Sequence, residues 1–100
     1  LAPSLAHVGV GNFHAGVLLD PDDAGEVANV KAFVDRLIRR ALEMEGTCTG
    51  EHGIGQGKQR YMRLEHGDAA VELMRTLKQA VDPMNLMNPG KIVPPTIAAE

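Results

Sequence analysis

The sequence predicts an α+β fold in which antiparallel strands form one layer and helices pack on it. Two short apolar runs, residues 5–9 and 13–19, are separated by the turn Val10-Gly11-Asn12. Two longer segments, residues 24–45 and 69–81, repeat apolar side chains at helical spacing. Short apolar runs divided by Gly and Asn are typical of strand–turn–strand units, and the longer pattern is typical of amphipathic helices. We expect the strands to join a larger sheet whose other strands lie upstream.

The first predicted helix, residues 24–45, has a recognisable signal at each end. Asp23, followed three residues later by Glu26, fits a capping box. Gly46 lies just past the expected end, where a left-handed residue is common. The apolar positions of this helix are Val27, Val30, Val34, Leu37, Ile38, Ala41 and Leu42.

The second half of the chain begins with a glycine-rich loop. Residues 46–58 include five glycines, which favours neither a packed helix nor an ordinary strand. Residues 59–65 could form a short helix, and Asp68 could cap the next one, residues 69–81. Its predicted inner face is Ala70, Leu73, Met74, Leu77 and Val81. Asp82-Pro83 should end this helix, and the tail that follows is predicted to be extended.

Composition excludes several classes of protein. The chain has 100 residues and 44% hydrophobic residues, enough for one domain with a core. Its net charge of −3 lacks the basic surplus of a nucleic-acid binder. No apolar run approaches the roughly 20 residues of a membrane span. Cys48 is the single cysteine, so no internal disulfide can form.

Two histidines flank a glycine turn in His7-Val-Gly-Val-Gly-Asn-Phe-His14. They are seven residues apart, so on one straight strand they would point to opposite faces. The turn can fold the chain back and bring both imidazoles, which are common ligands of transition metals, to one point. The alternative is a pair of unrelated histidines, one in the core and one at the surface.

An acid and a base stand together in the glycine loop, as Glu51-His52. A carboxylate beside two imidazoles would give a site with two nitrogen ligands, one oxygen ligand and open positions, as a catalytic metal requires. His52 could then act as a general base near neutral pH. The alternative is an exposed charged turn with His52 in solvent. Zinc and manganese both suit these ligands.

Three motifs in order resemble one family. They are His7-Val-Gly-x-Gly-Asn-Phe-His14, Gly46-Thr-x-Thr-Gly-Glu-His52-Gly-Ile-Gly and Asp82-Pro-x-Asn-x-Met-Asn-Pro-Gly-Lys91. The chain is similar, over about residues 5–94, to the C-terminal, substrate-side (cap) domain of FAD-linked oxidases of the vanillyl-alcohol-oxidase type. Members of that family include D-lactate dehydrogenase, the flavin subunit of glycolate oxidase and D-2-hydroxyglutarate dehydrogenase.

The resemblance implies a role for each motif residue. His7, His14 and Glu51 would bind a divalent metal, Zn or Mn, and His52 would be the catalytic base. Asn88 would lie near the flavin. The implied reaction oxidises a D-2-hydroxy acid, such as D-lactate or glycolate, to the 2-oxo acid, with FAD accepting the hydride. Gly16 replaces an asparagine that touches substrate in D-2-hydroxyglutarate dehydrogenase, which favours a smaller acid.

The resemblance also implies an incomplete flavin site. The chain does not begin with Met and contains no dinucleotide-binding loop. We therefore expect residues 1–100 to be the C-terminal part of a longer enzyme whose FAD-binding domain lies upstream, and to be inactive alone. One departure is Val10, where the family usually has Asp. It keeps open the alternative of a non-catalytic metal-binding or assembly module; an ether-lipid synthase is a further alternative, against which Glu51-His52 argues.

Partners and location follow from the same resemblance. We expect a small 2-hydroxy acid as substrate and an electron-acceptor protein or quinone, with no nucleic acid and no membrane span. An exposed strand edge could pair with a second copy as a homo-oligomer. The expected location is cytoplasmic or membrane-peripheral, or mitochondrial in a eukaryote.

Overall fold

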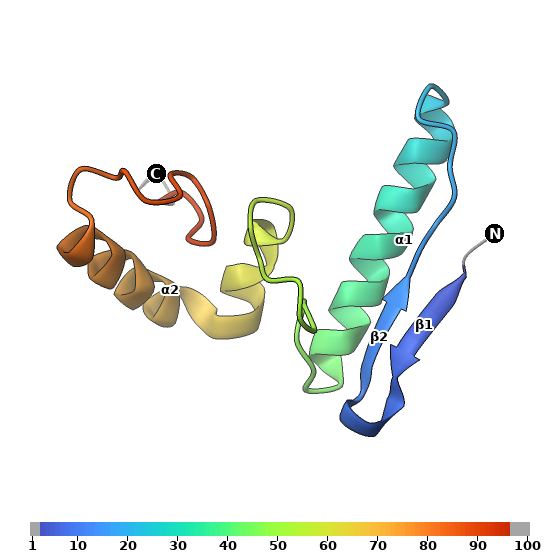
Figure 1. The fold of residues 1–100 in the computed structure, drawn as a ribbon, viewed down its shortest axis with the longest axis horizontal. Helices are drawn as coiled ribbons and strands as arrows, with labels where there is room; N and C mark the ends of the chain where they lie inside the picture. Colours follow the sequence, from blue (N-terminus) through green and yellow to red (C-terminus); the bar gives the residue numbers. More distant parts are fainter. Residues whose placement is uncertain (1–2, 97–100) are drawn as a thin grey trace. The chain divides into compact units, whose positions relative to one another are not determined.

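A computed structural model describes residues 3–96 of the chain. The chain divides into two compact units, Leu1–Gly50 and Glu51–Glu100. The first unit holds a two-stranded antiparallel sheet and one long helix, and the second holds a bent helix and the segment that follows it (Figure 1). This arrangement confirms the predicted α+β class for the part of the chain described. Within residues 3–96, no helix is both long and apolar enough to cross a bilayer.

The sheet of the first unit is a β-hairpin. Strands β1 (Ser4–His7) and β2 (Asn12–Ala15) are shorter than the two apolar runs that predicted them. The turn between them is a short 3₁₀ helix, η1 (Val8–Val10), closed by a hydrogen bond from the Gly11 amide to the Val8 carbonyl at 3.2 Å. Gly11 has a φ of 70°, the left-handed conformation that glycine adopts without strain. The predicted strand–turn–strand unit is therefore confirmed.

Helix α1 (Ala24–Glu43) begins as the sequence predicted, with one difference. The Asp23 carboxylate accepts hydrogen bonds from the amides of Gly25 at 2.8 Å and Glu26 at 3.0 Å, so Asp23 is the N-cap. The Glu26 carboxylate accepts from the Asp20 amide at 2.7 Å and leaves the Asp23 amide to the Asp20 carbonyl. The reciprocal half of the predicted capping box is therefore wrong, because Asp20 folds back over the helix start.

The end of α1 corrects the role predicted for Gly46. The left-handed residue is Glu45, with a φ of 61°, and the Gly46 amide reaches back to the Ala41 carbonyl at 2.8 Å. Together with the bond from the Glu45 amide to the Leu42 carbonyl, this is a Schellman motif. Glycine is needed at position 46 for space, since a β-carbon there would lie 2.8 Å from the Ala41 carbonyl oxygen.

The apolar face predicted for α1 is confirmed. Its seven predicted positions are buried or half-buried, with Ile38 the most buried of them. Cys48, in the loop after the helix, is also buried. These side chains form the small core of the first unit.

The second unit is built on helix α2 (Met62–Val81), which follows a 3₁₀ turn, η2 (Gln59–Tyr61). Gly67 interrupts the helix with a φ of 78° and a ψ of 164°, so the chain bends between the two helical pieces that the sequence predicted. The core of this unit is Tyr61, Met62 and Val71.

The inner face predicted for α2 is wrong at three of its five positions, since only Ala70 and Met74 are half-buried. Leu73, Leu77 and Val81 are 60%, 58% and 73% exposed, whereas Val71 is fully buried. Arg75, on the same side of the helix as Val71, donates to the Pro94 carbonyl, and the C-terminal segment therefore covers that side. The spacing of apolar residues predicted that the side of Leu73 and Leu77 is buried. Polar contacts instead hold the C-terminal segment over the side of Val71 and Arg75.

The segment after α2 is not extended as predicted. Asn85, Asn88, Gly90 and Ile92 all have positive φ, so the chain folds into successive turns. The Ile92 amide donates to the Gly55 carbonyl at 2.8 Å, and the Gln59 side chain donates to the Val93 carbonyl at 2.7 Å. These bonds hold the segment against the glycine loop of the same unit.

Candidate metal and catalytic site

The hairpin register places the two motif histidines on one face of the sheet. His7 pairs with Asn12 across the strands, and Leu5 pairs with His14. Residues directly opposite each other in an antiparallel pair share a face, and so do residues two apart on one strand. His7, Asn12 and His14 therefore lie on the same face, because the turn changes the parity that an odd spacing would impose on a straight strand.

The two imidazoles are close neighbours on that face. Their ring centroids are 5.6 Å apart and the ring planes meet at 77°. This closeness is expected for diagonal neighbours on one face of an antiparallel pair. His7 is exposed and His14 is half-buried. The convergence that the sequence predicted for these two side chains is present in the structure.

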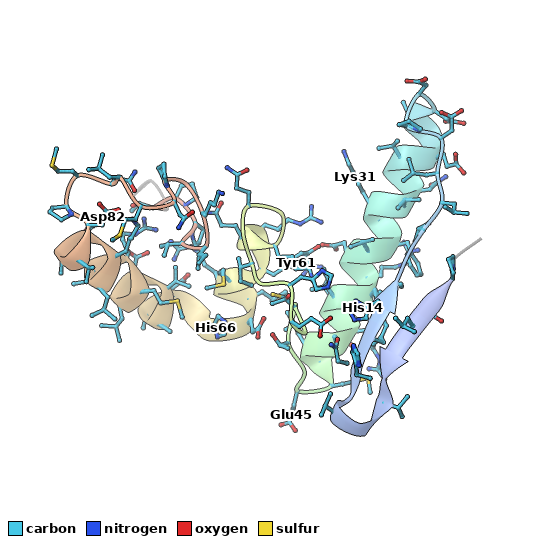
Figure 2. The ribbon with its side chains drawn as sticks, viewed as in Figure 1. His14, Lys31, Glu45, Tyr61, His66 and Asp82 are labelled. Atoms are coloured by element: carbon cyan, nitrogen blue, oxygen red, sulfur yellow. The ribbon has the colours of Figure 1, made fainter. Side chains whose placement is uncertain are left out.

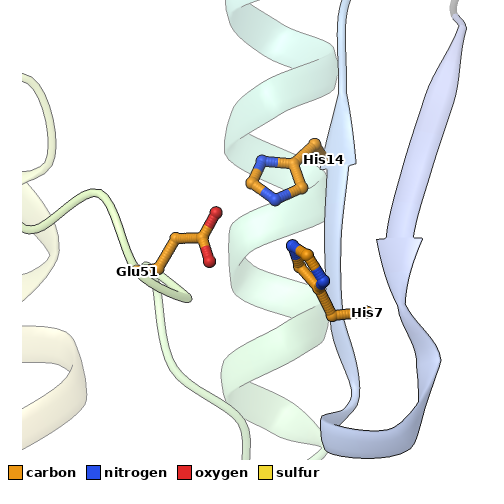
Figure 3. A group of neighbouring side chains, drawn as sticks. All are labelled: His7, His14 and Glu51. Carbon is orange, nitrogen blue, oxygen red and sulfur yellow. The ribbon is translucent and has the colours of Figure 1, made fainter.

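Glu51 brings a carboxylate to the same place. It is bonded directly to Gly50, the last residue of the first unit, and its side chain points toward both rings (Figure 3). One ligand atom from each of His7, His14 and Glu51 lies within 4.8 Å of the other two. Ligand atoms around one tetrahedral Zn²⁺ are about 3.3 Å apart, so modest side-chain rotations would bring these three within bonding distance of one metal ion.

The donor set fits a divalent transition metal. Two imidazole nitrogens and one carboxylate oxygen are ligands that zinc and manganese both accept. The site is also accessible, since the Glu51 side chain is 48% exposed. Three protein ligands leave coordination positions open, which distinguishes catalytic from structural sites.

His52 is adjacent to this carboxylate. Its Nε2 atom lies 3.5 Å from Glu51 Oε1, and its side chain is 73% exposed. An imidazole in this position is open to solvent and to a small molecule. The role of His52 as a base stays a prediction.

Asn88 belongs to the second unit and lies in one of the turns after α2. Its φ is 46°, and its carbonyl accepts a hydrogen bond from the Lys91 amide at 3.3 Å. The side chain is exposed. A role near a flavin stays a prediction for this residue.

Three neighbours of the site, Asn12, Thr49 and Gly50, were not singled out by the sequence analysis. Gly50 lies so close to Asn12 that a β-carbon on Gly50 would be 2.6 Å from Asn12 Cγ. The Thr49 hydroxyl oxygen is buried without a hydrogen-bond partner in the part of the chain that the structure describes. Asn12 stands an even number of residues before His14, so strand alternation could have placed it on the histidine face.

Comparison with known proteins assigns the family. Residues 4–92 match the family described as FAD linked oxidases, C-terminal domain. The chain belongs to this family. It is 57% identical over 91 residues to a probable mitochondrial D-lactate dehydrogenase of Danio rerio, covering 91% of this chain and 18% of that protein.

Two further relatives show the range of the family. The mitochondrial D-lactate dehydrogenase [cytochrome] 1 of Saccharomyces cerevisiae is 49% identical over 88 residues, which is 88% of this chain and 15% of that protein. The glycolate oxidase subunit GlcD of Bacillus subtilis is 35% identical over 89 residues, 89% of this chain and 19% of that protein. The chain thus spans less than a fifth of the length of these relatives.

Proposed function

We propose that this chain is the metal-binding and catalytic-base part of a flavin-dependent dehydrogenase that oxidises a D-2-hydroxy acid to the 2-oxo acid. The observation that carries the proposal is the convergence of His7, His14 and Glu51, with His52 beside the carboxylate. The family of FAD linked oxidases supports the redox cofactor, and the names of the relatives support the substrate class.

The relatives favour D-lactate as the substrate. Identity is 57% and 49% to two relatives named D-lactate dehydrogenase, against 35% to a relative named glycolate oxidase subunit. Gly16, which lacks a side chain near the end of β2, is consistent with a small acid whose tail needs no polar partner there.

The proposed site residues have separate roles in the oxidation. His7, His14 and Glu51 would hold the metal, which when bound supplies a Lewis acid that lowers the pKa of the substrate hydroxyl. His52 Nε2 would take the hydroxyl proton as the hydride leaves C2. FAD, when bound, supplies the acceptor of that hydride. Proton and hydride together are the two electrons and two hydrogens lost in forming the 2-oxo acid.

We also propose that residues 1–100 are the C-terminal part of a longer polypeptide with an upstream FAD-binding domain. The length of the relatives supports this, as does the exposed apolar side of α2 formed by Leu73, Leu77 and Val81. Exposed apolar stripes of this kind are usually covered by other protein. The yeast relative has cytochrome in its name, which supports an electron-acceptor protein, and a mitochondrial location in a eukaryote.

The proposal is tested by flavin reduction in the full-length polypeptide that contains this chain. In anaerobic stopped-flow experiments, D-lactate should bleach the flavin faster than glycolate or L-lactate. His52→Gln should slow this step about 10²- to 10⁴-fold, the usual contribution of a general base, and should leave the bound metal in place.

His66→Gln is the matched control, because Glu65-His66-Gly67 repeats the tripeptide Glu51-His52-Gly53 away from the motif. His66 lies beside the kink in α2, with Nε2 3.9 Å from Glu65 Oε1. This variant should reduce flavin at the unchanged rate. Equal rates of flavin reduction in the His52 and His66 variants would show that His52 is not the catalytic base.

A further inference from the structure

We propose that Asn12 and Gly50 are positioning residues whose contact places Glu51 beside the two imidazoles. This inference rests on the proposed metal site and names the device that assembles it. Both residues belong to the first unit, so the contact lies within one compact part of the chain. Neither residue is a ligand; each acts through the carboxylate that follows Gly50.

The first observation is steric. A β-carbon on Gly50 would lie 2.6 Å from Asn12 Cγ and 3.0 Å from Asn12 Nδ2, and still closer to Oδ1. Gly50 does not have the left-handed φ that Gly53 and Gly55 have. A methyl group at position 50 would therefore force the Asn12 side chain out of its present position, although the backbone conformation of Gly50 would permit it.

The second observation is the location of Asn12. It is the cross-strand partner of His7 and lies two residues before His14 on β2, on the same face of the hairpin. A loop that rests on Asn12 therefore rests on the face that carries both imidazoles. Because Glu51 is the next residue, its side chain begins at a backbone position close to the two rings.

The third observation is the burial of the residues leading to the contact. Cys48 is 3% exposed, and the Thr49 hydroxyl oxygen is inaccessible to solvent. The chain is thus anchored immediately before Gly50. After Gly50 the loop opens, and a β-carbon on Gly53 or Gly57 would meet nothing within 4 Å. The part of the loop that is held by these contacts therefore ends at Gly50, immediately before the Glu51 carboxylate.

The test is a calorimetric titration of the metal-free full-length polypeptide with Zn²⁺ and with Mn²⁺. Gly50→Ala should weaken binding about 10- to 100-fold, the usual effect of losing a partner that orients a ligand. The double variant Asn12→Ala/Gly50→Ala should recover only part of that loss, since it removes the atoms that the new methyl group would meet but also the side chain on which the loop rests. Gly57→Ala, the same change in open space, should bind as the unaltered protein does.

A second readout separates this inference from the metal site itself. Amide hydrogen exchange of residues 48–53, measured without metal, should be faster in Gly50→Ala than in Gly57→Ala. In the double variant it should be slower than in Gly50→Ala. If the unaltered protein binds neither metal but exchange follows this pattern, the positioning contact stands and the proposed metal function fails. If Gly50→Ala matches Gly57→Ala in exchange, or the double variant recovers nothing, the positioning role is overturned.

Discussion

Asp82 is a buried carboxylate that organises the turn after α2. It accepts hydrogen bonds from the amides of Leu86 and Met87, both at 2.9 Å, and from the Lys78 ammonium group. Figure 2 shows it at the C-terminal end of the helix. The Lys78 hydrogen bond, followed by that from the Leu86 amide, lowers the pKa of Asp82 from its ordinary 3.8 to about 2. The charged form is therefore favoured by the fold.

The Asp82 pKa predicts a specific dependence of stability on pH. A carboxyl group with a depressed pKa contributes stability above its unfolded value of 3.8, and this contribution is lost as pH falls through the folded value of about 2. Asp82→Asn should therefore destabilise the second unit most above pH 4, and the difference from the unaltered protein should shrink toward pH 2. Urea denaturation across this range measures it. Asp22→Asn, at an exposed turn carboxylate, is the control, and a difference independent of pH would contradict the account.

At the level of single residues, the sequence was informative where backbone geometry is simple. His7 and His14 could be brought together from the turn between them, because strand alternation and one reversal are enough. Asn12 and Gly50 were missed as partners, since a steric contact between residues so far apart follows from tertiary structure. Glu51 was linked to the histidines by resemblance and by ligand chemistry, and in the structure one ligand atom of each of the three residues lies within 4.8 Å of the other two.

Among the elements, the C-terminal end of α1 gives a second prediction. Glu45 adopts a φ of 61° at the position where glycine is common, and its side chain points into solvent (Figure 2). Glu45→Gly should stabilise the first unit by roughly 0.5–1 kcal/mol, since the left-handed conformation is unfavourable for residues with a β-carbon. Glu45→Ala is the control for loss of charge and should give no such gain.

Gly46→Ala tests the other half of the same helix end. Its β-carbon would lie 2.8 Å from the Ala41 carbonyl oxygen, so the variant should lose about 1–3 kcal/mol of stability. The free energies of unfolding of Glu45→Gly and Gly46→Ala, measured with denaturant, should change in opposite directions relative to the unaltered protein. A Gly46→Ala variant at least as stable as the unaltered protein would contradict the steric account of position 46.

The helices differ in how far sequence patterns described them. In α1 the apolar repeat predicted the buried face, because the core of the first unit is made of apolar side chains. In α2 the same reasoning failed for Leu73, Leu77 and Val81. The covered side carries Arg75, Lys78 and Asp82, whose partners lie mainly in the turns that follow the helix. Periodicity detects apolar faces, and it contains no information on which polar groups find partners later in the chain.

On the scale of the molecule, the three proposed metal ligands come from two short stretches of the chain. The hairpin carries both imidazoles, and the loop that follows Gly50 carries the Glu51 carboxylate. Family membership and the α+β class followed from motifs and periodicity. The α2 face and the turns of the tail could not be predicted, since both depend on contacts between segments.

The most direct test of the account is a titration of metal-free full-length polypeptide with Zn²⁺ and Mn²⁺, beside the double variant His14→Ala/Glu51→Gln. We expect one site of micromolar affinity or tighter that is lost in this variant. The control His66→Ala/Glu65→Gln removes another histidine and glutamate and should keep the site. No binding by the unaltered protein, or equal binding by His14→Ala/Glu51→Gln, would contradict the claim that His7, His14 and Glu51 hold a catalytic metal.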